Sequence, residues 1–302
     1  MELRHLRYFV AVAEHDSIGR AAEHLHMAQP PLTRQIRQLE RELGAALFLR
    51  TNRGVELTNA GRVFLDDARR VLQLAEQAGD RAQRAGDGAI GRIDIALFGT
   101  GIFGVIPVLL KAYRAATPDV TIVLHNMDKE AQLDALEHGT IDVAFNRVVG
   151  PQGGVTTEVL LAERLFVAIP DDHPLAARTA VRLAELEAQP LVLFPRGLRP
   201  NFIDIVRDAC RAVGFEPTVA AEVDDVVHGI ALVASGGALC LVPTSGKNLH
   251  VPGVVYRPLT HSPTLHVDLC CIYRTNDPSP VLARMLASFR ATAAELSARG
   301  GT

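Results

Sequence analysis

Three glycines, Gly99, Gly101 and Gly104, form a G-x-G-x-x-G pattern between a strand-like run and a helix-like run. In dinucleotide-binding folds, such glycines let the backbone approach a pyrophosphate at a helix N-terminus, and an acidic residue after the second strand binds the ribose. The second strand expected here, residues 121–124, is followed by the sequence His-Asn-Met and not by an acid. We therefore expect this loop to bring a small anion to a helix N-terminus, with an NAD(H) site in a redox sensor as the alternative.

Polar and aromatic side chains also follow other strand-like runs of this region. Asn146 and Arg147 follow the strand expected at 141–145, and the stretch FPRGLRPNF follows a later one. The carboxyl ends of parallel strands meet at one edge of a sheet, where ligands bind. The Thr100 hydroxyl, free helix N–H groups and Arg147 would hold a carboxylate there, with Phe103 and Phe202 beside it. The residues predicted on this basis are Gly99, Thr100, Arg147, Arg196, Asn201 and Phe202.

Other interpretations of this region are open at this stage. Each arginine could instead form an ion pair that only supports the fold. Enzymatic activity is less favoured, because the chain contains no G-x-S-x-G, H-E-x-x-H or P-loop pattern and its 11 histidines are scattered. The 4 cysteines lack the spacing of a zinc site or a disulfide framework. We therefore predict no catalytic residue, no metal and no cofactor.

A second group of residues, near the N-terminus, has the pattern of a helix that reads DNA. One face of the helix expected over 30–43 is apolar, and the opposite face carries Arg34, Arg37 and Arg41. The apolar stripe consists of Leu32, Ile36, Leu39 and Leu43. Amphipathic segments at 3–13 and 18–26 precede it, as in a helix-turn-helix whose last helix enters the major groove. The residues predicted to contact DNA are Gln29, Pro30, Pro31, Thr33, Arg34, Arg37, Gln38 and Arg53.

The charge balance indicates a local DNA-binding patch and excludes a uniformly basic surface. The whole chain has a formal net charge of -3, whereas residues 28–53 contain five arginines and two glutamates. Arg50 and Arg53 flank a turn that we expect to join two short strands into a wing. Arg53 would then lie near the phosphates or the minor groove.

Residues 59–86 are expected to form one long helix with an apolar seam. Thr58 is a suitable N-cap, and the sequence AGDGAIG predicts a hinge after the helix. The seam, with spacings of four and three residues, consists of Phe64, Ala68, Val71, Ala75, Ala78, Ala82 and Ala85. A single surface helix is the simpler interpretation. We favour dimerisation, because two paired helices would hold two DNA-reading heads apart for a two-fold symmetric site.

Strand-like and helix-like segments alternate from residue 90 onward. Strands expected at 93–97, 120–124 and 141–145 enclose helices at 102–116 and 128–138, which predicts a parallel sheet covered by helices. Further strands are expected at 165–169, 191–194, 238–242 and 265–273, and further helices at 202–213, 224–234 and 280–296. The predicted organisation is a DNA-binding domain over 1–58, a linker helix over 59–89 and an α/β ligand-binding domain over 90–302.

The N-terminus, MELRHLRYFV, is charged and lacks the features of a signal peptide. No apolar run of the sequence approaches the roughly 18 residues that span a membrane. We therefore expect a cytoplasmic protein that has no membrane partner.

The stretch AAEHLHMAQPPLTRQIRQLE, followed by LGAALFLR, resembles the DNA-binding part of LysR-type transcriptional regulators. The resemblance extends more weakly over the rest of the chain. It implies a winged helix-turn-helix, a long linker helix and a two-lobed α/β effector domain like type 2 periplasmic binding proteins. It also implies a homotetramer, built as a dimer of dimers, that binds promoter DNA and is switched by a small molecule. Closure of the lobes would then change a DNA bend and expose the site for RNA polymerase.

The segments GTGIFG, EAQLDALEHGTIDVAFNRV, FPRGLRPNF and ALVASGGALCLVP resemble the branch that controls catechol, chlorocatechol and benzoate breakdown. Effectors of that branch include cis,cis-muconate. The resemblance implies that Thr100 and Arg147 bind the effector carboxylate and that Phe202 lines the pocket. Asp128 and Lys129 stand where the branch often has a Gly-Thr pair. They join the residues expected at the effector, where a lysine would strengthen anion binding or fill the pocket.

Overall fold

The computed structural model describes residues 1–51, 54–150, 152–260 and 265–298. These residues form two compact units, Met1–Arg84 and Ala85–Thr302. Each unit has its own buried apolar core, so each is described by itself. Within the described residues, no helix is long and apolar enough to cross a membrane.

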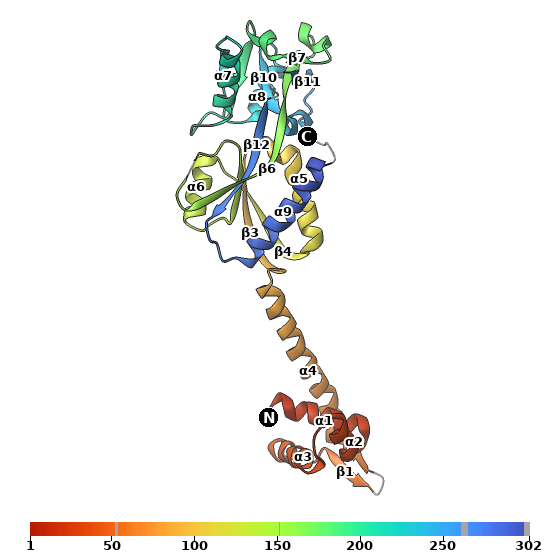
Figure 1. Ribbon diagram of the computed structural model, residues 1–302. Coiled ribbons are helices and arrows are strands. Elements are labelled where there is room, and N and C mark those ends of the chain that lie inside the picture. The colour runs from red at the N-terminus through yellow and green to blue at the C-terminus, as the bar shows by residue number, and fades with distance from the viewer. Residues whose placement is uncertain (52–53, 151, 261–264, 299–302) are drawn as a thin grey trace. The chain divides into compact units, whose positions relative to one another are not determined.

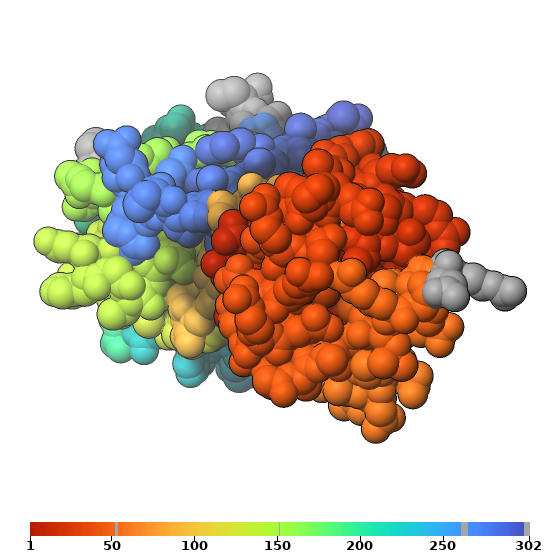
Figure 2. All heavy atoms as spheres, turned by 90° about the horizontal axis from the view of Figure 1, so that it is seen from below, coloured from red at the N-terminus to blue at the C-terminus, as the bar shows by residue number. Residues whose placement is uncertain are grey.

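The first unit is a winged helix-turn-helix, as the sequence predicted. Its elements are α1 (Leu3–His15), α2 (Ile18–His24), α3 (Gln29–Leu43), β1 (Phe48–Thr51) and β2 (Gly54–Leu57). Strands β1 and β2 pair in an antiparallel hairpin. The Phe9 ring lies in the centre of the core, 5.2 Å from the ring of Phe48 and 5.1 Å from that of Phe64. Figure 2 shows this unit as closely packed atoms coloured red to orange.

Two details of the first unit differ from the expectation. Helix α2 ends at His24 and not at His26, whose φ of 52° lies in the left-handed region. Leu43 is 37% exposed, so it does not continue the buried stripe of α3. Its position in the last turn, directly before the C-cap Gly44, explains this exposure because the chain turns away from the core there.

Helix α4 (Asn59–Gly86) follows the wing. The Thr58 hydroxyl accepts a hydrogen bond of 2.9 Å from the Gly61 N–H, which confirms the predicted N-cap. Ala68 is buried against the first unit's core, but every residue from 76 to 87 is exposed in the single chain. Val71 and Leu74 are also exposed, at 43% and 66%. The middle of the helix therefore presents apolar side chains that this chain itself leaves uncovered.

The second unit consists of two lobes, and the first lobe contains the parallel strands that were expected. Strands β3 (Ile90–Leu97), β4 (Asp119–Asn126) and β5 (Val143–Asn146) lie in the order β4-β3-β5. In Figure 1, helices α5 (Val105–Ala116) and α9 (Pro280–Ala298) cover one face, and α6 (Lys129–Glu137) covers the other. Separate groups of buried side chains lie on the two faces.

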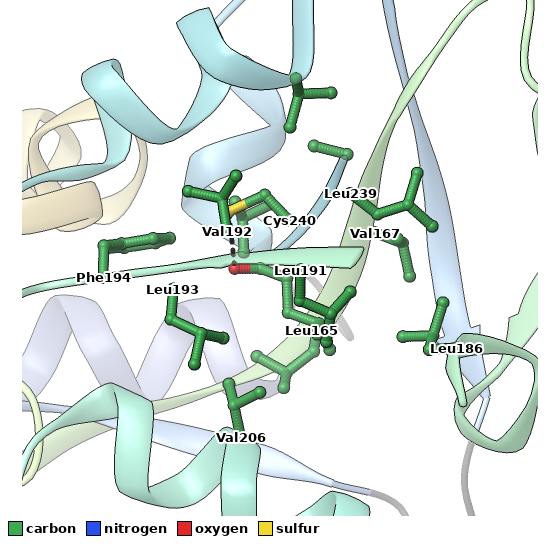
Figure 3. Close-up of a cluster of buried hydrophobic side chains, with 14 of the residues drawn as sticks. Leu165, Val167, Leu186, Leu191, Val192, Leu193, Phe194, Val206, Leu239 and Cys240 are labelled. Atoms are coloured by element: carbon green, nitrogen blue, oxygen red, sulfur yellow. Dashed lines mark hydrogen bonds between the residues drawn. The ribbon is translucent and has the colours of Figure 1, made fainter. Parts of the chain in front are cut away.

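The second lobe repeats this arrangement. Strands β8 (Pro190–Leu193), β9 (Thr218–Glu222) and β10 (Leu239–Pro243) are parallel, with helices α7 (Phe202–Ala212) and α8 (Val226–Ala234) packed against them. Figure 3 shows how Val192 and Cys240 meet in the core of this lobe. Shorter elements complete it: η2 (Pro174–Ala177), β7 (Val181–Arg182), η3 (Leu183–Leu186), η4 (Thr244–Asn248) and β11 (Val254–Thr260).

Two long antiparallel strands, β6 (Val155–Pro170) and β12 (His266–Arg274), connect the lobes. Strand β12 pairs with β5 of the first lobe, whereas β6 continues into the second lobe and pairs with β10 and β11. Figure 1 shows both strands running from one lobe into the other. The sequence predicted only residues 165–169 of β6, because its first half lacks the continuous apolar run of a fully buried strand.

Other elements were misplaced or missed. The helix expected from residue 102 begins at Val105, because Gly99–Phe103 forms a separate 3-10 turn, η1. Strands β9 and β11 were not expected, since their side chains are mostly exposed or half-buried and give weak periodicity.

We predict opposite effects for two glycine-to-alanine substitutions in α4. A Cβ at Gly61 would lie 2.2 Å from the Leu47 carbonyl oxygen, whereas a Cβ at Gly79 would have no neighbour within 4 Å. Gly61→Ala should therefore destabilise the first unit by about 1–3 kcal/mol. Gly79→Ala should stabilise the helix by about 0.5–1 kcal/mol. Urea unfolding followed by circular dichroism measures both changes, and equal midpoints for the two variants would contradict the close packing at Gly61.

Candidate functional site

A cavity of about 90 Å³ lies in the second unit, at the carboxyl ends of strands from both lobes. Phe98 follows β3, Asn146 ends β5, Phe194 follows β8 and Pro243 ends β10. The cavity lining includes all eight residues that the sequence predicted for a ligand, namely Gly99, Thr100, Asp128, Lys129, Arg147, Arg196, Asn201 and Phe202. The fold therefore brings together residues that are up to 103 positions apart in the chain.

Two buried polar atoms of the cavity lack a partner among the described residues. The Thr100 side chain is buried, and its Oγ1 makes no hydrogen bond. The Arg147 Nη1 is likewise buried without a hydrogen bond. Buried polar groups are nearly always satisfied in folded proteins, since an unpaired donor costs about 1–3 kcal/mol. These two atoms therefore mark the place where a polar group of a ligand would fit.

Arg147 also forms an ion pair that supports the fold. Its Nη2 contacts Glu163 of β6, and only 10% of the Arg147 side chain and 4% of the Glu163 side chain are exposed. The other Glu163 oxygen accepts hydrogen bonds from the N–H and the hydroxyl of Ser245 in η4. Glu163 was not singled out from the sequence. It lies between Leu161 and Leu165 at the inward positions of a strand, and that spacing was the available signal.

Arg196 is paired in a different way. It contacts Asp224 at 2.9 Å, but both side chains are more than 60% exposed. Exposed pairs of this kind contribute little to stability because water competes for both charges. Both Arg147 and Arg196 therefore form an ion pair, as the structural interpretation of these arginines expected. Arg147 has in addition one N–H group that makes no hydrogen bond with a described residue.

Asp128 and Lys129 are neighbours in the sequence, but their side chains make different contacts. The Asp128 carboxylate caps α6 by accepting a 2.9 Å hydrogen bond from the Ala131 N–H. The Lys129 ammonium donates 2.8 Å to the Val148 carbonyl and also contacts the Pro200 carbonyl. Burial lowers the pKa of Lys129, because the charged form loses hydration there.

Asn201 and Phe202 mainly shape the cavity wall. Asn201 caps α7, accepting from the Ile203 N–H at 2.9 Å and donating to the Pro195 carbonyl at 3.0 Å. Phe202 is buried, and its ring centroid lies 5.4 Å from that of Phe194. The expectation that Phe103 walls the slot was wrong: Phe103 packs against the core of the second lobe, and Phe98 and Phe194 line the cavity instead.

The glycines of the G-x-G-x-x-G loop allow close packing between segments. A Cβ at Gly101 would lie 2.8 Å from Ile106, and one at Gly104 would lie 2.2 Å from the Ser245 hydroxyl. Strand β4 ends at Asn126, and the next carboxylate, Asp128, is occupied by its capping bond. The loop thus brings η1 against η4 and offers no acidic partner for a ribose.

The exposed face of α3 carries the residues expected to contact DNA. Gln29, Pro30, Arg34 and Arg37 are exposed, whereas Pro31, Thr33 and Gln38 are half-buried. Neither Arg34 nor Arg37 forms an ion pair with a described residue. The remaining residue of this prediction, Arg53, lies outside the residues that the structure describes.

Comparison with known families identifies both units. Residues 3–62 match the bacterial regulatory helix-turn-helix proteins of the lysR family, and residues 86–294 match the LysR substrate binding domain. The chain belongs to the LysR family. The HTH-type transcriptional regulator TcbR of Pseudomonas sp. (strain P51) is 39% identical over 293 residues, which cover 97% of this chain and 99% of TcbR.

Two solved structures of LysR-family proteins extend the comparison. Full-length CbnR in complex with its target DNA is 38% identical, with a TM-score of 0.83 over 97% of this chain and 100% of CbnR. The effector binding domain of BenM with its effector benzoate is 30% identical, with a TM-score of 0.62 over 70% of this chain and 95% of that domain. The chain is therefore a DNA-binding transcriptional regulator, and this family membership does not favour the nicotinamide-sensor alternative.

We predict that breaking the ion pair Arg147–Glu163 lowers the stability of the second unit more than breaking the ion pair Arg196–Asp224. Glu163→Ala leaves the buried Arg147 cation without its counterion and should destabilise the second unit by about 3–5 kcal/mol. Arg196→Ala removes an exposed pair and should change stability by less than about 1 kcal/mol. Urea unfolding of the full chain measures both. A Glu163→Ala variant as stable as Arg196→Ala would show that the buried pair is not structural.

Proposed function

We propose that this LysR-family regulator activates transcription in response to a small organic acid that binds between the two lobes. The supporting observation is the pair of buried, unsatisfied atoms, Thr100 Oγ1 and Arg147 Nη1, at the strand ends. Both can donate a hydrogen bond to one carboxylate. The benzoate named as the effector of the BenM domain supports an aromatic acid or a muconate from aromatic breakdown as the ligand class.

The effector site comprises the eight predicted residues, which have different roles. Thr100 and Arg147 bind the carboxylate, Gly99 leaves room for its approach, and Phe202 provides the apolar wall. Arg196, which is exposed, lies at the entrance, Asn201 forms part of the wall, and Asp128 and Lys129 form the side at the N-terminus of α6. We propose no catalytic role for this cavity, because the chain belongs to a family of transcriptional regulators.

The DNA-binding residues of α3 read bases in the major groove. The predicted set is Gln29, Pro30, Pro31, Thr33, Arg34, Arg37 and Gln38, with Arg53 of the wing at the phosphates or minor groove. Arg34 and Arg37 are exposed and form no ion pair with a residue that the structure describes, so both are suited to bidentate contacts with guanine. This division assigns DNA reading to residues 1–58, dimerisation to 59–89 and effector binding to 90–302.

Self-association through α4 explains its uncovered apolar side chains. Val71 and Leu74 are exposed in the single chain and would be buried against the same helix of a second copy. Two such dimers would form the tetramer, which binds two-fold symmetric promoter DNA and makes a site accessible to RNA polymerase. An effector can drive this change only through different affinities for two lobe arrangements.

Arg34→Ala should weaken specific DNA binding more than non-specific binding. The loss of a base contact costs about 1–3 kcal/mol on a duplex selected by the protein, and less on random DNA. Arg53→Ala should instead lower the salt dependence of binding, whose slope is roughly -0.9 per phosphate contact. Fluorescence anisotropy on both duplexes measures these effects, with the exposed Arg178→Ala as the charge-matched control. Equal losses on both duplexes for Arg34→Ala would exclude base reading.

Arg147→Ala should leave promoter binding intact and abolish the response to inducer. The reason is that Arg147 lies in the second unit, where it would bind the effector and not the DNA. Because the variant also leaves the buried Glu163 unpaired, urea unfolding must show that the second unit of Arg147→Ala is still folded under the assay conditions. A promoter-reporter assay with benzoate and cis,cis-muconate measures the response, and anisotropy measures DNA binding. Arg178→Ala, exposed and outside the cavity lining, is the matched control. Normal induction of Arg147→Ala would remove this residue from the effector site.

A further inference from the structure

The two lobes touch at two places around the cavity. On one side η1 packs tightly on η4: Asn248 donates 2.8 Å to the Phe103 carbonyl, and Gly104 has no room for a Cβ beside Ser245. On the other side, Lys129 connects α6 of the first lobe with the segment that precedes α7 in the second. The first contact is tightly packed, whereas the second combines the packing of Val148 against the core of the second lobe with the hydrogen bonds of one long side chain, Lys129.

The Lys129 ammonium spans the cleft. It donates 2.8 Å to the carbonyl of Val148, which follows β5 in the first lobe, and it also donates to the carbonyl of Pro200 in the second lobe. The two carbonyls belong to neighbouring segments, since a Cβ at Gly150 would lie 4.0 Å from the Pro200 ring. An ammonium group has three N–H donors, and the third has no hydrogen-bond partner among the described residues.

The position of Lys129 is electrostatically unfavourable for the fold. It is the first residue of α6, where the helix dipole repels a cation. Burial also lowers its pKa, and the negative charge of Asp204 offsets this only in part. The Asp204 carboxylate is itself engaged by Arg199 and by the Asn201 N–H. Helix stability therefore does not explain a lysine at this position.

The charge balance of the cavity gives Lys129 a different role from the two arginines. Glu163 neutralises Arg147, and Asp224 neutralises Arg196. Lys129 forms no ion pair with a described residue and binds only neutral carbonyls. An anion that enters the cavity can therefore form an ion pair with Lys129, since no described carboxylate contacts its ammonium and Asp204 acts on it only through the longer-range Coulomb field.

We propose that Lys129 determines the charge class of the effector: its ammonium bridges the lobes through two carbonyls, and a carboxylate of the effector replaces the Pro200 carbonyl. This inference rests on the proposed effector site and names the recognition element within it. A carboxylate can displace the carbonyl because a charge-assisted hydrogen bond is roughly twice as strong as a neutral one. A neutral amide offers no such gain, so the bridge selects acids over their amides.

The first experiment tests the bridge without a ligand. Lys129→Met keeps the length of the side chain and removes its charge, and Lys111→Met is the matched control, an exposed lysine on α5. Hydrogen–deuterium exchange of the full chain should show several-fold faster exchange of the amides at 201–206 in Lys129→Met. Lys129→Arg should retain protection, because the guanidinium also donates to carbonyls. Exchange in Lys129→Met equal to wild type would overturn the bridge.

The second experiment tests charge selection with benzoate, benzamide, cis,cis-muconate and muconamide. In titration calorimetry, the wild type should bind the acids at least about tenfold more tightly than the amides. Lys129→Met should reduce this preference several-fold through weaker acid binding, because only Thr100 and Arg147 remain to bind the carboxylate, while Lys111→Met keeps it. An unchanged preference in Lys129→Met would overturn the role of Lys129 alone. If the wild type binds none of the acids, the proposed effector class and the replacement of the Pro200 carbonyl by a carboxylate are both overturned. The hydrogen–deuterium exchange experiment would still decide whether Lys129 bridges the lobes.

Discussion

A buried carboxylate, that of Glu163, joins the parts of the ligand-binding unit that must stay together. It lies on β6, a strand shared by both lobes, and binds Arg147, directly after β5, and Ser245 in η4, which follows β10. A carboxylate in this environment is stable only when it is fully paired. The ends of β5 and β10 are therefore held together next to the cavity. The same pairing leaves Nη1 of Arg147 without a hydrogen bond among the described residues, in a cavity that Thr100 also lines.

The strands that connect the lobes allow this part of the cavity to stay fixed while the other contacts between the lobes change. Only β6 and β12 are described as strands common to both lobes, and their antiparallel pairing continues from one to the other. Tight packing of η1 on η4 lies at one side of the cavity, and the Lys129 bridge lies at the other. A ligand that replaces one partner of Lys129 changes the contacts between the lobes, which is the differential affinity that a switch requires.

In the DNA-binding unit, helix α3 has one apolar side packed in the core and one polar side exposed to solvent. Leu32, Ile36 and Leu39 are buried against α1 and α2, so α3 can present its arginines in only one direction. Because those arginines have no carboxylate partner among the described residues, their charges are available to an anionic polymer.

The sequence by itself determined the elements whose periodicity is strong: the three N-terminal helices, the wing, the long helix and the βαβαβ order that begins with β3. It also determined which residues meet at the cavity, because polar groups after parallel strands converge wherever such a sheet forms. Only the tertiary structure decided how their charges are used. Glu163 and Pro200 are 16 and 71 residues from the side chains that they bind, and local spacing carries no information on such pairs. Likewise, β9 and β11 became strands through pairing with neighbours, since their own half-exposed patterns do not specify an edge.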